Sequence, residues 1–141
     1  MFYTFLINSI LVSLSVLIHY EVLYQLAKKL PYINIIPRYR VLFGVFVILI
    51  AHVIEIWLFA TGYYLMINLH DLGILSGNFN QSLLDCVYFS FVSYTTVGFG
   101  DIEPSGHLRF LSGLEALTGL VLITWSASFL FIEMQKYWPK R

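Results

Sequence analysis

The sequence predicts an all-α membrane protein with three transmembrane helices and a re-entrant segment between the second and the third. Of its 141 residues, 59% are hydrophobic and 11% are charged, and the mean hydropathy is +0.79. Soluble domains have fewer apolar and more charged residues, which argues against a soluble fold. Three stretches are also apolar over the roughly 20 residues that a helix needs to cross a bilayer. They are residues 4–27, 41–67 and 107–133.

The first unit, residues 1–40, is predicted to contain one transmembrane helix and a turn after it. The apolar stretch 5–18 has no Lys or Arg before it and no small-residue cleavage site after it. We therefore expect it to stay in the mature protein instead of acting as a signal peptide. Pro31 and Pro37 enclose the next short segment and keep the first helix from continuing into the second. This predicts a tight elbow between the two helices.

The second unit, residues 41–141, is predicted to contain two transmembrane helices with a longer excursion between them. The start of the excursion is rich in glycine and asparagine, as expected of a solvated loop. Its second part is apolar and aromatic but too short to span a membrane, which favours a re-entrant half-helix. The predicted parts are an outer helix at 41–67, an outer loop at 68–82, a short helix at 83–94, a connecting segment at 95–101 and an inner helix at 107–136.

The positions of the basic residues predict the orientation in the membrane. Four lie between the first two helices and three follow the third: Lys28, Lys29, Arg38, Arg40, Lys136, Lys140 and Arg141. Because short cytoplasmic segments carry an excess of Lys and Arg, both places are expected to be cytoplasmic. The chain would then be a multi-pass protein of the cell membrane, with its N-terminus outside and its C-terminus in the cytoplasm. A formal net charge of zero gives no indication of a nucleic-acid partner.

The segment 95–101, with the sequence Thr-Thr-Val-Gly-Phe-Gly-Asp, is the most informative motif in the chain. For consecutive carbonyl oxygens to face one axis, alternate residues must adopt unusual backbone angles, including positive φ. Gly98 and Gly100 allow such angles at little steric cost. Val97 and Phe99 can then turn their side chains away from the axis. The backbone would present a column of oxygens that can replace the hydration shell of an ion.

This segment resembles the selectivity filter of potassium channels, and the similarity extends from the second predicted helix through the third. Further similar residues are Ile102, Glu103 and Pro104 after the segment, and Arg109, Glu115 and Gly119 on the third helix. The resemblance implies the tetrameric potassium channel pore fold, a homotetramer in membrane lipid that conducts K⁺ passively. K⁺ would be the permeant ligand, with no other cofactor and no nucleic acid. The resemblance assigns K⁺ binding to the filter residues Thr96, Val97, Gly98, Phe99 and Gly100, with the carbonyls of the first four and the Thr96 hydroxyl as ligands.

Three residues beside the filter are expected to support it: Thr95, Asp101 and Tyr88. In the family, an aspartate at the position of Asp101 forms a hydrogen bond behind the filter, and in some relatives its partner is a glutamate on the half-helix. The corresponding residue here is Val92, so we consider the hydroxyl of Tyr88 as a substitute donor. Alternatively, Asp101 is a solvated carboxylate that attracts cations to the mouth of the pore.

Gly119 on the third helix has two interpretations. The resemblance implies a hinge at which the inner helix bends during gating. Glycine also allows membrane helices to pack closely, and the sequence alone does not separate the two roles.

Four ionisable residues in the predicted membrane helices form a candidate polar cluster: His19, His52, Glu55 and Glu115. An intramembrane carboxylate is costly unless it is paired or protonated. His52 and Glu55 are three residues apart and can touch on one helical face, while His19 falls at a similar depth. The cluster is either a proton sensor, since histidine titrates near neutral pH, or a set of structural hydrogen bonds. These residue types also suit a transition metal, although their spacing is not distinctive.

The sequence is also compatible with three other functions. They are a non-selective cation channel, a membrane subunit of a potassium uptake transporter, and an accessory membrane protein that does not conduct. Transporters with related filters usually carry four such loops in one chain, whereas one is seen here. No catalytic constellation or phosphate-binding loop is recognised, so no enzyme is predicted. No arginine-repeat helix is recognised either, which argues against voltage sensing.

Overall fold

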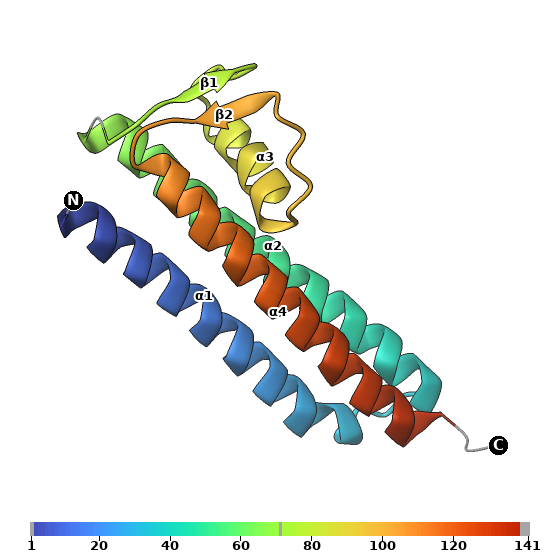
Figure 1. The fold of residues 1–141 in the computed structure, drawn as a ribbon. Coiled ribbons are helices and arrows are strands. Elements are labelled where there is room, and N and C mark those ends of the chain that lie inside the picture. Colours follow the sequence, from blue (N-terminus) through green and yellow to red (C-terminus); the bar gives the residue numbers. More distant parts are fainter. Residues whose placement is uncertain (1, 71, 139–141) are drawn as a thin grey trace.

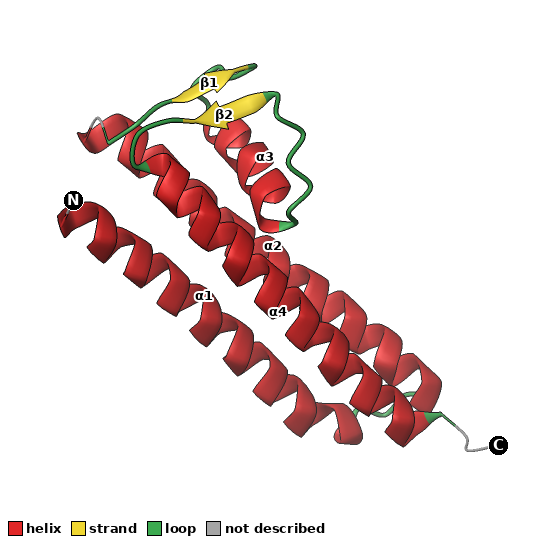
Figure 2. Cartoon of the chain, viewed as in Figure 1, coloured by secondary structure: helices red, strands yellow, loops and turns green. Residues whose placement is uncertain are grey.

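The computed structural model describes residues 2–70 and 72–138, and most of them are helical (Figure 2). Three long helices, α1 (Phe2–Lys29), α2 (Pro37–His70) and α4 (Leu108–Tyr137), lie side by side in an elongated bundle (Figure 1). A shorter helix, α3 (Leu83–Tyr94), packs against α2 and α4 at one end of the bundle. Among the described residues, the three long helices are apolar and long enough to cross a membrane. This confirms the predicted all-α fold with three transmembrane helices.

The elbow between α1 and α2 forms at the two prolines. One 3-10 turn, η1 (Leu30–Tyr32), follows α1 and contains Pro31 in its first turn. α2 then begins at Pro37, ahead of the predicted start at residue 41. Proline fits the first turn of a helix, where its missing N–H has no intrahelical partner to lose. The helix therefore starts in the polar region before the apolar stretch.

The bounds of α4 and the end of α2 also differ slightly from those predicted. α2 continues to His70, past the predicted end at residue 67, so the outer loop is shorter than expected. α4 starts at Leu108 because His107 is its N-cap residue, and it ends at Tyr137. Apolar patterning marks the part of a helix that crosses the membrane, whereas these ends extend beyond that part.

α1 contacts α2 and α4 through a face that carries polar side chains. The buried polar residues on this face are Thr4, Asn8, Ser15 and His19. Their spacings of four, seven and four residues place them on one side of a helix. Large apolar side chains such as Leu17 point away from the bundle and are exposed. Polar groups inside and apolar groups outside are expected of a helix surrounded by lipid.

The N-terminus of α3 is fixed by side-chain hydrogen bonds. Ser82 is the N-cap residue, and its hydroxyl accepts a hydrogen bond of 3.0 Å from the amide of Asp85. The Asp85 carboxylate in turn accepts one of 2.8 Å from the amide of Asn80. α3 runs from the end of the bundle towards its middle, where its last residue, Tyr94, is fully buried (Figure 1).

The predicted outer loop contains a strand that the sequence analysis missed. β1 (Leu75–Gly77) pairs antiparallel with β2 (Ile102–Pro104), directly after the segment 95–101. The amide of Asn78 also donates a 2.9 Å hydrogen bond to the carbonyl of Asp101. The outer loop therefore holds the far end of this segment in place. Strands of three residues are too short to produce a recognisable alternating pattern.

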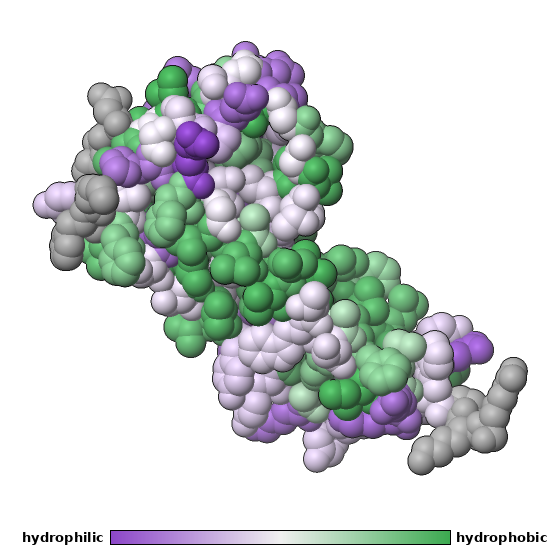
Figure 3. Space-filling model, in the orientation of Figure 1, coloured by the Kyte–Doolittle hydropathy of each residue, from purple (hydrophilic) through white to green (hydrophobic). Residues whose placement is uncertain are grey.

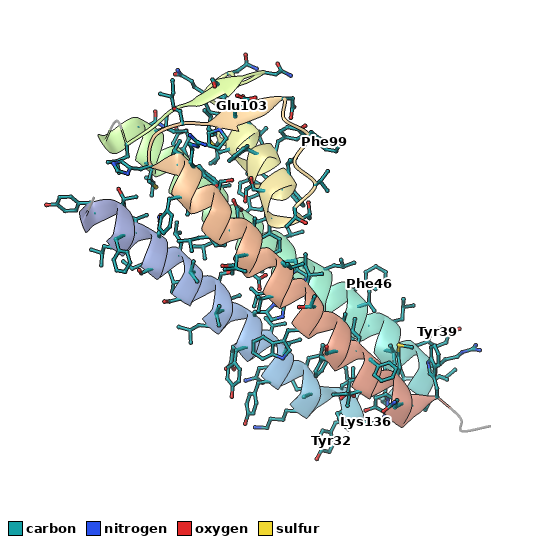
Figure 4. All side chains as sticks on the ribbon, viewed as in Figure 1. Tyr32, Tyr39, Phe46, Phe99, Glu103 and Lys136 are labelled. Carbon is teal, nitrogen blue, oxygen red and sulfur yellow. The ribbon has the colours of Figure 1, made fainter. Side chains whose placement is uncertain are left out.

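The polarity of the surface matches that of a membrane-spanning bundle. Apolar residues cover much of the middle of the visible face, and hydrophilic residues gather near the strands and near the opposite end (Figure 3). The N-terminal end of α1 lies at the end of the bundle that carries the strands, and α4 ends at the other (Figure 1). Figure 4 places Glu103 and Phe99 at the first end and Tyr39 and Lys136 at the second.

Candidate functional site

The backbone of the segment after α3 alternates between two conformations. Thr96, Gly98 and Gly100 have positive φ values of 59°, 59° and 77°, whereas Val97 and Phe99 between them do not have positive φ. Such alternation turns successive carbonyl groups towards the same side of the chain. The glycines were expected from the sequence, but the positive φ of Thr96 was not, because threonine is rarely found in this conformation.

Hydrogen bonds attach the start of this segment to the end of α3. The amide of Thr96 donates to the carbonyl of Ser93 at 3.0 Å, and the amides of Val97 and Gly98 donate to that of Val92 at 3.1 and 3.3 Å. In the described part of the chain, no donor is hydrogen-bonded to the carbonyls of residues 96–99. The amides are thus used to fix the segment, and its carbonyl oxygens remain available.

The two glycines are required for their conformation and not for lack of space. A Cβ atom built at Gly98 or Gly100 would meet no atom within 4 Å. The side chains of Val97 and Phe99 are 54% and 68% exposed, and Phe99 lies at the outer edge of the segment (Figure 4). Two apolar side chains thus remain uncovered when the chain is considered alone.

Tyr88 of α3 and Asp101, the last residue of the segment, form a hydrogen bond. The Tyr88 hydroxyl donates to Oδ2 of Asp101 at 2.8 Å. This hydrogen bond raises the pKa of Tyr88 above its ordinary value, so the phenol keeps its proton at neutral pH. Thr95 at the other end of the segment donates its hydroxyl to the Phe91 carbonyl at 2.6 Å, within the last turn of α3. Both ends of the segment are therefore bonded to α3.

Gly119 lies where the backbone of α4 packs directly against the end of α3. A Cβ atom at this position would be 2.1 Å from the carbonyl oxygen of Tyr94 and 2.9 Å from its carbonyl carbon. Real Cβ atoms essentially never come closer than 3.0 Å to such atoms. Close packing against the backbone of Tyr94 is thus sufficient to require glycine at position 119. Tyr94 is the residue directly before Thr95.

The structure separates the four ionisable residues that the sequence analysis grouped together. Glu115 contacts neither histidine: its carboxylate is hydrogen-bonded by Tyr63 of α2 and Ser90 of α3, each at 2.5 Å. The Ser90 hydroxyl also lies 2.8 Å from the carbonyl of Ile56. One hydroxyl proton cannot serve both acceptors, so this network is complete only when Glu115 itself carries a proton.

Glu55 forms the second group, together with both histidines. Its Oε1 lies 2.9 Å from Nδ1 of His19, and its Oε2 lies 3.1 Å from Nδ1 of His52. The Tyr94 hydroxyl also donates to Oε2. Ser126 of α4 lies on the far side of both imidazole rings, 3.1 Å from Nε2 of His19 and 3.2 Å from Nε2 of His52. The cluster joins α1, α2, α3 and α4.

Four hydroxyl groups of these two networks were missed from the sequence: those of Tyr63 and Ser90, which bond Glu115, that of Tyr94, which bonds Glu55, and that of Ser126, which bonds the histidines. Ser90 and Tyr94 are four residues apart on α3 and therefore share one face of it. Ser90 is hydrogen-bonded to Glu115 and Tyr94 to Glu55, which explains why the two groups are separate. Ser126 lies 11 residues, about three turns, after Glu115 on α4 and hence on the same side of that helix. Hydroxyl residues at helical spacing in an apolar segment were the signal that could have identified them.

Comparison with known protein families identifies a match to part of the chain. The model of a family described as ion channels matches residues 51–136, which extend from the middle of α2 almost to the end of α4. The match includes α3 and the whole of the segment 95–101, whereas α1 lies outside it. No curated protein and no solved structure matches the chain.

Proposed function

Because this chain belongs to the ion channel family, we propose that it is a subunit of a potassium-selective channel whose filter is residues 96–100. One observation carries the proposal: positive φ recurs at every second residue from Thr96 to Gly100. This geometry suits a column of carbonyl oxygens that replaces the hydration shell of K⁺. The ligands would be the carbonyls of residues 96–99 and the Thr96 hydroxyl.

A single chain supplies only one side of such a site, so we propose a homotetramer around a central axis. The exposed side chains of Val97 and Phe99 support this assembly, because neighbouring subunits would cover them. The C-terminal end of α3 would point towards the ion path, where its partial negative charge favours a cation. Transport would be passive, with ions moving in single file and repelling one another onward.

We further propose that the end of the bundle with the strands faces the outside and the elbow faces the cytoplasm. The basic residues around the elbow and after α4 support this orientation. The N-terminus would then be outside, and lipid would surround the apolar outer faces of α1 and α2. Tyr88 and Asp101 would support the filter from its outer side.

Reversal potentials test the proposed selectivity. We expect purified protein in planar bilayers, with K⁺ on one side and Na⁺ on the other, to prefer K⁺ at least tenfold. For a monovalent ion this corresponds to a reversal potential about 59 mV or more from zero. A reversal potential near zero would instead indicate a non-selective cation channel. Absence of current would favour an accessory protein or a transporter subunit that needs a partner.

Particle images of the same purified material test the assembly. We expect fourfold symmetry with ion density along the axis, beside the carbonyls of residues 96–99. A monomer or a dimer, with this segment away from any central passage, would contradict the proposal.

The substitution Tyr88→Phe tests the support of the filter by Asp101. It removes the 2.8 Å hydrogen bond and leaves the aromatic ring in place. We expect the current to decline severalfold faster under maintained voltage, because the outer end of the filter loses its side-chain contact with α3. Tyr64→Phe, which removes an exposed hydroxyl from α2, is the matched control. Equal decay in both variants would show that Asp101 acts only as a charge at the mouth.

A further inference from the structure

The hydrogen bonds around Glu55 define how many protons the cluster contains. Both imidazole rings of His19 and His52 present Nδ1 to the Glu55 carboxylate and Nε2 to the single hydroxyl of Ser126. Each of these four contacts needs one proton between its two atoms. The Tyr94 hydroxyl lies next to Oε2 of Glu55 and also 3.0 Å from Nδ1 of His52, and its one proton can serve only one of these two contacts.

Two neutral histidines and an ionised Glu55 have too few protons for these contacts. If each ring carries its proton on Nδ1, both Nε2 atoms are acceptors, and the one proton of Ser126 can serve only one of them. If instead one ring carries its proton on Nε2, its Nδ1 faces the carboxylate without a proton of its own. In His52 that Nδ1 could accept from the Tyr94 hydroxyl, but Tyr94 would then no longer donate to Oε2 of Glu55, so one contact still lacks a proton. One added proton completes the network: one ring donates from Nε2 to Ser126, and Ser126 donates to the other ring. The count is the same if that proton resides on Glu55.

A second added proton is excluded by the stacking of the two rings. The centroids of His19 and His52 are 5.1 Å apart and their planes differ by 30°. Two imidazolium ions in this arrangement would repel each other and leave an unbalanced positive charge. His19 and Glu55 are fully buried, and the side chain of His52 is 13% exposed, so water screens this charge little. One added proton makes the cluster neutral.

The surroundings of the cluster add no other counter-charge. Among the described residues of α3, the titratable group that faces it is Tyr94. Glu115 of α4 is hydrogen-bonded to Tyr63 and Ser90 instead. Trp125 of α4 places its ring 5.6 Å from that of His19, a distance at which an aromatic ring favours a cation. In the described part of α1 and α2, His19, His52 and Glu55 are the ionisable residues in contact with one another here.

We propose that His19, His52 and Glu55 form a buried site that binds one shared proton and that this proton attaches α1 to the pore. His19 lies on α1, outside the residues that match the channel family, whereas its partners lie within them. Tyr94, which is bonded to Glu55, directly precedes the segment 95–101. Loss of the proton leaves a buried carboxylate without a counter-charge and one contact of Ser126 unmade. The connection from His19 of α1 through Glu55 of α2 to Tyr94 at the end of α3 then weakens.

A divalent cation is the competing occupant of this site. The donor atoms of the three side chains lie within 4.8 Å of one another, as a metal site requires. However, both Nδ1 atoms and both carboxylate oxygens are already used in hydrogen bonds, and a metal would have to replace all of them. The geometry therefore favours the proton.

NMR of the tetramer in lipid, labelled with ¹⁵N in histidine and with ¹³C in the glutamate carboxyl groups, tests the proposal without any measurement of current. The other two histidines are replaced in a His70→Asn, His107→Asn background, so that only the two rings of interest are observed. At pH 7, after zinc chelation, we expect one added proton over the two rings and Glu55, released in a single step as the pH rises. Two neutral rings with no added proton, two imidazolium ions, or stoichiometric zinc in the unchelated protein would overturn the proposal.

Ser126 variants test the role of the bridge. Ser126→Ala removes the hydroxyl between the rings, and we expect proton release to move to lower pH by ~1 to 2 units, since a hydrogen bond to a charged group is lost. Ser126→Thr keeps a hydroxyl and is expected to restore the release step. Ser128→Ala is the matched control, because Ser128 is exposed on the same helix and bonds only the Thr124 carbonyl. An unchanged release step in Ser126→Ala would refute the shared proton.

Thermal unfolding of the unsubstituted tetramer measures the attachment of α1. The proposed attachment requires the folded protein to bind the proton more tightly than the unfolded chain, so the stability that the proton contributes would be present at low pH and lost as the pH rises through the release step. We expect the melting temperature to fall over the same pH range in which NMR detects release. A melting temperature that does not change over that range would show that the proton does not hold α1.

Discussion

Replacing Gly98 by alanine is expected to abolish selective K⁺ conduction. Gly98 has φ = 59°, a conformation that costs a residue with a side chain about 1 to 2 kcal/mol. In the proposed tetramer four copies share one filter, so the cost is about 4 to 8 kcal/mol per channel. Alanine can avoid this cost by returning to negative φ. That change rotates the neighbouring peptide groups and removes carbonyl oxygens from the column.

Because an added side chain at Gly98 has open space, any effect of Gly98→Ala can be attributed to the backbone conformation. No atom lies within 4 Å of the added Cβ, so steric overlap within the chain does not contribute. Gly113→Ala is the matched control, because Gly113 is on α4, does not have positive φ, and its added Cβ also meets nothing. Bi-ionic recordings of both variants are the measurement. If Gly98→Ala retained K⁺ selectivity like the control, the carbonyl column could not be the filter.

The transmembrane helices and the short α3 could be predicted because the membrane restricts which secondary structures an embedded segment can adopt. An apolar segment in lipid must satisfy its own backbone hydrogen bonds, so length and apolar composition are enough to identify a helix. The same argument explains the errors at the ends. Pro37 and His70 lie at ends of α2 that the apolar stretch does not include, and nothing in hydropathy marks them.

Contacts between distant segments could not be predicted in the same way. β1 and β2 are joined by backbone hydrogen bonds between residues far apart in the sequence, and each strand is only three residues long. The positive φ of Thr96 is imposed by the hydrogen bonds that hold residues 96–98 to the end of α3. Neither feature depends on a residue type with a strong local preference, so local sequence patterns did not reveal them.

The candidate site was predicted only in part, because residue types reveal local features but not the direction in which each side chain points. Glycine positions identified the segment 95–101, and the missing glutamate at Val92 directed attention to Tyr88, which does bond Asp101. Depth along the helices placed Glu55 and Glu115 close together but could not show which way each side chain points. The hydroxyls of Ser90 and Tyr94 decide this, because they lie about one turn apart on α3 and give each carboxylate a different partner.

Replacing Gly119 by alanine is expected to destabilise the proposed tetramer strongly and to reduce conduction. The added Cβ would lie 2.1 Å from the Tyr94 carbonyl oxygen, a backbone atom that cannot turn aside. α4 or the end of α3 must therefore move, and overpacking of this kind costs about 1 to 3 kcal/mol per chain. Because Tyr94 lies just before the proposed filter, the displacement is expected to disturb the first carbonyls of residues 96–99 as well.

The melting temperature of the tetramer separates this packing role from a hinge. A hinge glycine weakens its helix, so alanine at a pure hinge should raise stability by up to about 1 kcal/mol per chain and alter only channel opening. Packing predicts the opposite sign: a melting temperature several degrees lower for Gly119→Ala and an unchanged or higher one for Gly113→Ala, whose Cβ has open space on the same helix. Equal stabilisation of both variants, with altered opening in Gly119→Ala alone, would establish the hinge. A loss of stability confined to Gly119→Ala would instead mean that α4 needs glycine here because the end of α3, and with it the start of the filter, rests directly against its backbone.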